Sequence, residues 1–171
     1  MKNILIILGT AREGRQSEKV AKFIYNYLQQ KNDVTCQLLD VVDFVQSHSL
    51  GLNGQASLKW RESIIWADAI IIVSPEYNHS FPGELKLLLD SETTIYRDKL
   101  TAICGVSSGA FGGARMIEQL KLVLHTLGFK VITESLFFAQ VQDIFLKDGT
   151  MHEQDKWQAR VDKLLVSLLE A

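Results

Sequence analysis

Hydroxyl and guanidinium side chains gather in residues 9–17, Gly-Thr-Ala-Arg-Glu-Gly-Arg-Gln-Ser, directly after an apolar run. Arginine presents forked donors that match phosphate oxygens, and the first N–H groups of a helix beginning here would attract an anion. The segment is neither a P-loop nor a Gly-x-Gly-x-x-Gly dinucleotide fingerprint. A helix cap at Ser17 with solvated arginines is the structural alternative. The candidate phosphate-binding residues are Thr10, Arg12, Arg15, Gln16 and Ser17.

A second segment, residues 74–83, reads Ser-Pro-Glu-Tyr-Asn-His-Ser-Phe-Pro-Gly and follows the most apolar run of the chain. Prolines near both ends restrict the backbone, which favours a rigid surface that offers N–H groups and a ring to a planar ligand. The isoalloxazine ring of a flavin is such a ligand. Tyr77 alone is equally typical of a half-buried packing aromatic, and His79 of a surface or supporting histidine. The candidate ring contacts are Pro75, Glu76, Tyr77 and Asn78.

A third segment, residues 107–115, reads Ser-Ser-Gly-Ala-Phe-Gly-Gly-Ala-Arg and joins an apolar run to a helical pattern. Glycine lets the backbone approach a ligand closely, although any tight strand-to-helix turn can be rich in glycine. We name Ser107, Ser108, Gly109 and Gly112 as candidate cofactor contacts.

Other kinds of catalytic site find little support. The four histidines are scattered, so no metal site is predicted. There is no Gly-x-Ser-x-Gly nucleophile elbow, and Cys104 falls inside an expected strand. Cys36 and Cys104 could form one disulfide, but we expect free thiols in a cytoplasmic protein.

The elements that must position these segments alternate along the chain. Apolar runs predict strands, and apolar residues at helical spacing, such as the stripe from Val20 to Leu28, predict helices. In one expected helix the buried candidates are Leu58, Trp60, Ile64 and Ile65. The expected strands are 4–8, 34–39 (an edge strand), 69–73, 101–106 and 131–141, and the expected helices are 20–28, 55–67, 83–90, 116–127 and 157–168.

This βαβ alternation predicts a parallel sheet with helices on both faces. The three polar segments all leave the carboxyl ends of expected strands, which lie at one edge of such a sheet, where ligands bind. No linker or repeat divides the chain, so residues 1–171 are expected to form one domain.

Length and composition restrict the class of protein. The chain has 171 residues, of which 47% are apolar and 22% charged, as in ordered globular domains. A formal net charge of −2 argues against a nucleic-acid surface. No apolar run approaches the length of a membrane span, and the apolar N-terminal stretch is too short for a signal peptide, so a cytoplasmic protein is expected.

Together, the three segments resemble the NADPH-dependent FMN reductase family, which includes quinone, azo-dye and chromate reductases. The resemblance covers about residues 4–128, and one departure is Leu87-Leu88 where the family more often has Asn-Ala. The matching motifs are Gly-Thr-Ala-Arg at 9–12, Ser-Pro-Glu-Tyr-Asn at 74–78, Pro-Gly-Glu-Leu-Lys at 82–86, and Ser-Ser-Gly at 107–109 with Gly-Gly at 112–113.

The resemblance implies an α/β, flavodoxin-like three-layer sandwich with about five parallel strands in the order 2-1-3-4-5. It implies FMN bound without covalent attachment, NADPH or NADH as electron donor, and a homodimer or homotetramer. Thr10, Arg12 and Ser17 would hold the phosphate with Arg15 and Gln16 nearby. Residues 75–78 would hold the ring edge and residues 107–109 its far side.

The implied reaction is a ping-pong hydride transfer from NAD(P)H, through bound FMN, to a small-molecule quinone, azo compound or flavin. The flavin carries that chemistry, so no side chain is expected to be catalytic. A flavodoxin-type electron carrier and a non-enzymatic flavin-binding redox module are the alternatives. Carriers usually have a phosphate loop without arginine and an acidic surface, so Arg12, Arg15 and the nearly balanced charge favour the reductase.

Overall fold

A five-stranded parallel sheet forms the centre of the molecule in the computed structural model, which describes residues 1–44, 54–146 and 149–171. The strand order is β2-β1-β3-β4-β5, as expected, so β2 is an edge strand. The strands are β1 (Lys2–Leu8), β2 (Val34–Asp40), β3 (Ala69–Pro75), β4 (Leu100–Val106) and β5 (Lys130–Phe138).

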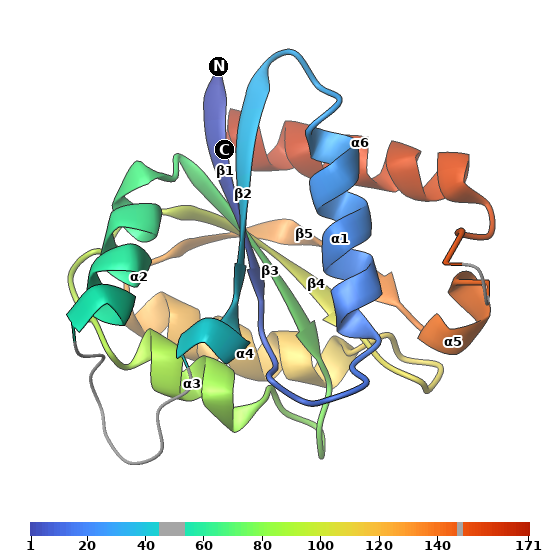
Figure 1. The fold of residues 1–171 in the computed structure, drawn as a ribbon, viewed down its shortest axis with the longest axis horizontal. Coiled ribbons are helices and arrows are strands. Elements are labelled where there is room, and N and C mark those ends of the chain that lie inside the picture. Colours follow the sequence, from blue (N-terminus) through green and yellow to red (C-terminus); the bar gives the residue numbers. More distant parts are fainter. Residues whose placement is uncertain (45–53, 147–148) are drawn as a thin grey trace.

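Helices cover both faces of the sheet and complete the expected three layers (Figure 1). One face packs against α1 (Ser17–Leu28), α5 (Val141–Ile144) and α6 (Gln154–Glu170). The other packs against η1 (Val41–Phe44), α2 (Gly54–Trp66), α3 (Gly83–Leu89) and α4 (Ala114–Thr126).

The alternation of side chains along β1 shows how a wholly apolar strand supplies two cores. Ile4 and Ile6 belong to the cluster under α1 and α6, whereas Leu5 and Ile7 belong to the cluster under α2, α3 and α4. Successive side chains on a strand point to opposite faces, so a strand covered on both sides must be apolar throughout.

Two expectations about these elements are wrong. Trp60 and Ile64 on α2 are fully buried as predicted, but Leu58 and Ile65 are 57% and 58% exposed. At 3.6 residues per turn, those two positions lie on the side of the helix away from Trp60 and Ile64. The last strand ends at Phe138, rather than at residue 141, because the chain turns at Gln140, whose φ is +47°, and enters α5.

The chain reverses direction across the sheet between β1 and β3. From β1 it moves to β2 at one edge, and it then returns past β1 to β3. A crevice forms at such a switch point, outside the carboxyl ends of the strands. In Figure 1 the loops that leave β1, β3 and β4 lie together at the lower edge of the sheet.

The two cysteines, Cys36 and Cys104, are free thiols, as expected. Burial raises the pKa of the Cys104 thiol to about 12. Among the described residues, no helix is both long and apolar enough to cross a membrane.

Candidate functional site

The loop after β1 is held in shape by a glutamate from α3. The Thr10 hydroxyl donates to Glu84 Oε1 at 3.2 Å, and the Ala11 N–H donates to the same oxygen at 3.1 Å. The Thr10 hydroxyl also accepts the Arg12 N–H at 3.3 Å. Thr10 is fully buried, so its hydroxyl shapes the loop from inside.

Arg15 is engaged with the end of β2. Its guanidinium forms an ion pair with the Asp40 carboxylate, with Nη1 2.8 Å from Oδ1, and also donates to the Thr10 carbonyl. The side chain is only 10% exposed. Of the two arginines expected at a phosphate, Arg15 therefore braces the loop.

Among the described residues, the side chains of Arg12 and Ser17 make no hydrogen bond or ion pair. Arg12 is exposed, with its guanidinium carbon 5.4 Å from the centre of the Tyr77 ring. Ser17 is 1% exposed, and its Oγ is buried without a hydrogen-bond partner among the described residues. Ser17 is the first residue of α1, and Gln16 at the N-cap makes no side-chain cap. The alternative in which Ser17 merely caps the helix is therefore not what the structure shows.

Arg12 and Ser17 line a hollow of about 320 Å³ at the β1/β3 switch point. The β1 loop forms one wall, and the ends of β3 and β4 form the opposite side. Val141, at the start of α5, adds an apolar contact that the sequence did not indicate. The lining residues are Arg12 to Ser17, Pro75 to Tyr77, Val106 to Ser108, and Val141.

The loop after β3 is a two-residue hairpin. Tyr77 and Ser80 exchange backbone hydrogen bonds of 2.9 and 3.0 Å, and Asn78 and His79 between them have φ values of +50° and +67°. Positive φ at both central residues is the geometry of a type I′ turn. Asparagine tolerates this conformation, whereas histidine does so at some cost. The segment after β3 therefore ends in a tight turn between Pro75 and Pro82.

A second hollow of about 290 Å³ adjoins the first and shares Glu76, Ser107 and Ser108 with it. It lies between the Asn78-His79 turn and the loop after β4. Its other lining residues are Gly109, Phe111 and Arg115. The two hollows together bring every expected ring contact except Gly112 to one place.

Gly112 lies behind the site. It is buried, with φ of +59°, and a Cβ added there would lie 2.8 Å from the Cβ of Phe137. Gly113 follows with φ of +84°, and its added Cβ would lie 2.9 Å from the Cα of Gly105. These glycines let the loop pack tightly on β4 and β5 rather than approach a ligand.

Arg115 was not predicted as a site residue, although it ends the third polar segment. It stands in the first turn of α4, and its Nε donates to Glu76 Oε1 at 2.7 Å. Its guanidinium carbon lies 5.2 Å from the centre of the Phe111 ring. In the sequence, Arg115 is a single arginine after Gly-Gly-Ala. Without the fold it cannot be distinguished from a solvated helix residue.

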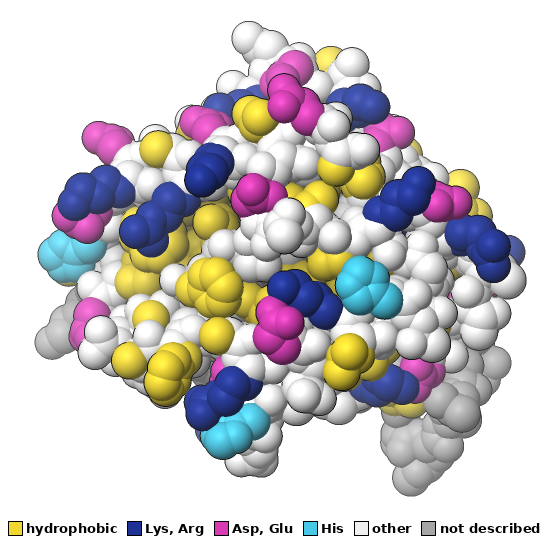
Figure 2. Space-filling view, turned by 180° about the vertical axis from the view of Figure 1, so that it is seen from behind, with side chains coloured by type: hydrophobic (Ala, Val, Ile, Leu, Met, Phe, Trp, Pro, Cys, Tyr) yellow, Lys and Arg dark blue, Asp and Glu magenta, His cyan; other side chains and the backbone are white. Residues whose placement is uncertain are grey.

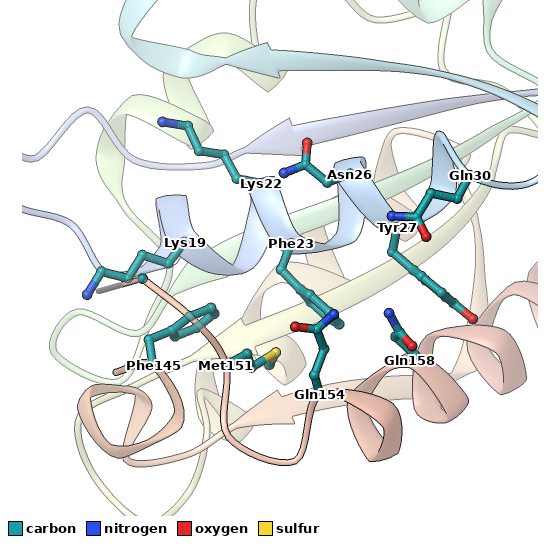
Figure 3. Close-up of a pocket in the computed structure, with 11 residues that line it drawn as sticks. Lys19, Lys22, Phe23, Asn26, Tyr27, Gln30, Phe145, Met151, Gln154 and Gln158 are labelled. Atoms are coloured by element: carbon teal, nitrogen blue, oxygen red, sulfur yellow. The ribbon is translucent and has the colours of Figure 1, made fainter. Parts of the chain in front are cut away.

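A separate groove of about 290 Å³ runs between α1 and α6 (Figure 3). Phe23, Phe145 and Met151 supply apolar surface, and the Lys19 ammonium lies 5.9 Å from the centre of the Phe145 ring. The remaining labelled side chains are lysine, asparagine, tyrosine and glutamine. None of the described residues that line it also lines the two hollows, so it takes no part in the site above.

A five-stranded parallel sheet of order 2-1-3-4-5 with a hollow at the β1/β3 switch point is the flavodoxin-like fold. Comparison with known proteins gives the family. The model for NADPH-dependent FMN reductase matches residues 2–143. The chain belongs to this family, and it is an FMN-dependent oxidoreductase.

Two relatives and one solved structure match nearly the whole chain. A quinone reductase of Pseudomonas putida is 27% identical, covering 94% of this chain and 91% of that protein. An NAD(P)H-dependent FMN reductase of Saccharomyces cerevisiae is 25% identical, covering 96% and 95%. The solved structure of FerB, a flavoenzyme NAD(P)H:(acceptor) oxidoreductase of Paracoccus denitrificans, has a TM-score of 0.80 at 22% identity, covering 99% and 98%. That likeness shows the shared fold.

Proposed function

We propose that this protein transfers electrons from NADPH or NADH to a quinone, azo compound or free flavin in a ping-pong reaction, through FMN bound in the two adjoining hollows. The observation that carries the proposal is Ser17, which lines the hollow beside Arg12 at the start of α1 and whose buried hydroxyl has no hydrogen-bond partner among the described residues. This combination suits a phosphate.

The residues divide by role in this proposal. Arg12, Gln16 and Ser17 hold the phosphate, while Thr10 and Arg15 keep the loop in the shape that presents them. The segment from Pro75 to Asn78 supports one edge of the ring, and Ser107, Ser108 and Gly109 lie on its other side. Gly112 supports that last segment from behind.

Bound FMN would supply hydride acceptance and electron release, which no side chain provides. The residues named above would hold and orient the ring. If donor and acceptor reach the ring at the same place, the oxidised donor must leave before the acceptor binds. This order is the physical basis of the ping-pong scheme.

The flavin content of an arginine variant tests the proposal. Arg12→Ala should retain much less FMN than the wild type after purification, as measured by visible absorbance, because the exposed phosphate partner is lost. Arg61→Ala, which removes an exposed arginine on α2 paired with Glu92, is the matched control. Equal flavin content in all three proteins would reject the phosphate role of Arg12.

Kinetics test the reaction. Purified protein should bleach on addition of NADPH or NADH and recover its colour with a quinone. Initial rates at several acceptor concentrations should give parallel double-reciprocal lines. Intersecting lines would reject the ping-pong order, and failure to bleach with either nicotinamide would reject the reductase.

We further propose that residues 1–171 act as one cytoplasmic FMN-binding domain that assembles as a homodimer or homotetramer. Phe111, Leu122 and Phe137 are 65%, 64% and 46% exposed, which is apolar surface suited to a partner subunit. On the face drawn in Figure 2, hydrophobic patches lie among interspersed acidic and basic side chains, without the basic stripe of a nucleic-acid surface. Sedimentation velocity would distinguish monomer, dimer and tetramer.

A further inference from the structure

The groove between α1 and α6 carries positive charge that nothing in the groove compensates. Its described lining residues include two lysines, Lys19 and Lys22, and no aspartate or glutamate. The Lys22 ammonium is paired with Glu18 at 2.6 Å. The Lys19 side chain is exposed and makes no ion pair or hydrogen bond with any residue that the structure describes. An anionic ligand is therefore favoured at the Lys19 end of the groove.

Four carboxamide side chains line the same groove and make no hydrogen bond within the described part of the chain: Asn26, Gln30, Gln154 and Gln158. In Figure 3 the side chains of Gln154 and Gln158 point from α6 toward α1. A carboxamide offers both donors and an acceptor, and glutamine can bind the edge of adenine through one of each. A ligand whose planar edge carries donors and acceptors suits this set of side chains.

The groove has an apolar floor and walls that are fixed to each other. Phe145 and Met151 line it and are 7% and 8% exposed. The Tyr27 hydroxyl on α1 donates to the Asp162 carboxylate on α6 at 2.7 Å, and the Lys31 ammonium lies 2.6 Å from the same carboxylate. Because the walls are already held together, a ligand pays little entropy to order them. The volume of about 290 Å³ is that of a small-molecule site.

The Lys19 end of the groove lies close to the first hollow. Ser17 lines that hollow, and Lys19 follows it on α1 with a rise of about 3 Å along the helix axis. Val141 also lines the hollow, and α5 leads from it directly to Phe145 in the groove. In the proposed function FMN occupies the two hollows, so the adenosine half of the NAD(P)H donor must lie outside them.

We propose that this groove binds the adenosine phosphate half of NAD(P)H, with Lys19 at the phosphates and Gln154 and Gln158 at the edge of the adenine. The inference rests on the proposed function, because the nicotinamide half must reach FMN in the hollows. The order of groups agrees along the groove: the lysine lies at the end nearer the hollow, and Gln158 lies farther along α6 (Figure 3). A dinucleotide has the same order, with its diphosphate between the nicotinamide and the adenine. The apolar faces of the base can pack on Phe23 and Met151.

Reduced nicotinamide mononucleotide gives the direct test, because it has the reacting ring but lacks the adenosine phosphate half. With FMN-loaded protein, Lys19→Ala and Gln158→Ala should each lower kcat/KM for the better of NADPH and NADH about 3- to 10-fold, mainly through KM. Neither variant should change kcat/KM for the mononucleotide. Lys19→Arg keeps the charge and should stay close to the wild type.

Two matched controls lie outside the groove. Lys156→Ala removes an exposed lysine on α6, and Gln29→Ala removes an exposed glutamine on α1. Both should use the dinucleotide and the mononucleotide as the wild type does.

Binding of adenosine monophosphate (AMP) tests the groove without any turnover. Calorimetric titration of the wild type with AMP should show binding that weakens about 3- to 10-fold in Lys19→Ala and in Gln158→Ala. AMP should compete with the dinucleotide and should not inhibit oxidation of the mononucleotide. AMP inhibition of both donors alike would place AMP elsewhere, for instance at the flavin, and would overturn the inference.

The outcomes separate this inference from the function on which it rests. If both groove variants use both donors as the wild type does, or lose activity with both donors equally, the groove does not hold the adenosine half and the reductase stands. If AMP binding depends on the groove but the use of NAD(P)H does not, the groove is a nucleotide site separate from the donor and the inference is overturned. If the wild type oxidises neither NADPH nor NADH, the proposed function fails and the inference fails with it.

Discussion

Glu84, in the first turn of α3, accepts a hydrogen bond from the Thr10 hydroxyl at 3.2 Å and thereby joins the segment after β3 to the loop after β1. The same oxygen accepts the Ala11 N–H at 3.1 Å. The two loops proposed to hold opposite ends of one cofactor are thus linked through this carboxylate, and the Thr10 hydroxyl is also within hydrogen-bond distance of the Tyr77 hydroxyl, at 3.4 Å. The geometry of the site depends on α3 although α3 itself lies outside the hollows.

Replacing Glu84 should damage both stability and binding. Glu84→Ala leaves the Ala11 N–H without its acceptor and the buried Thr10 hydroxyl with only the Tyr77 hydroxyl at 3.4 Å, so we expect a loss of about 1–3 kcal/mol in the free energy of unfolding. FMN affinity should fall as the loop loses its shape. Urea denaturation and a flavin titration measure the two effects, with the exposed Glu62→Ala on α2 as control. Equal stability of Glu84→Ala and Glu62→Ala would show that the loop after β1 keeps its shape without Glu84.

Ser17→Ala should separate stability from binding. The hydroxyl is buried and has no hydrogen-bond partner in the part of the chain that the structure describes, so its removal should leave the apoprotein equally stable, or more stable by up to about 1 kcal/mol. FMN affinity should fall about 10-fold or more, because a hydrogen bond to a phosphate is lost. Thermal unfolding of the apoprotein and fluorescence titration would be compared. A destabilised apoprotein with unchanged affinity would contradict the role given to Ser17.

The turn at Asn78-His79 should prefer glycine at its second position. His79 has φ of +67°, which costs a side chain about 1–2 kcal/mol, and the greater backbone freedom of glycine offsets part of that gain. We therefore expect His79→Gly to be as stable as the wild type or more stable by up to about 1 kcal/mol. His79→Val should be clearly destabilised, since a β-branched residue resists this conformation.

Retention of NADPH oxidation by His79→Gly would agree with a loop that acts through its backbone. Complete loss of turnover in a variant that still folds and still binds FMN would instead give the imidazole a direct part in the reaction. The comparison needs only the absorbance spectrum and a steady-state rate for the same preparation.

Two glycines of the third loop should differ sharply in their tolerance of alanine. Gly112→Ala places a Cβ 2.8 Å from the Cβ of Phe137 at a φ of +59°, so we expect a loss of about 2 kcal/mol or more in the free energy of unfolding. Gly109→Ala meets no atom within 4 Å and should leave stability nearly unchanged. Chemical denaturation of both variants makes the comparison. Equal stabilities would show that the loop can shift away from β5.

The sequence could predict the sheet because the runs 4–8 and 69–73 are apolar throughout, as in strands covered on both faces. Their alternation with helical stripes favours a covered parallel sheet, and three polar segments at strand ends point to one edge. Helix faces were harder to predict. Leu58 and Ile65 are as apolar as Ile64, and only the direction in which α2 packs decides that Ile64 is buried and the other two are exposed.

Within the site, the sequence by itself determined which segments carry donors, and it named Arg12, Ser17 and residues 75–78 from their composition. Tertiary structure decided which of those donors are free. Arg15 is engaged by Asp40 from another strand, Thr10 is engaged by Glu84 from another helix, and Glu76 is held by Arg115. Each partner is distant in sequence, and ion pairs and hydrogen bonds depend on separation in space. The fold therefore leaves the buried Ser17 Oγ and Glu76 Oε2 without hydrogen-bond partners among the described residues.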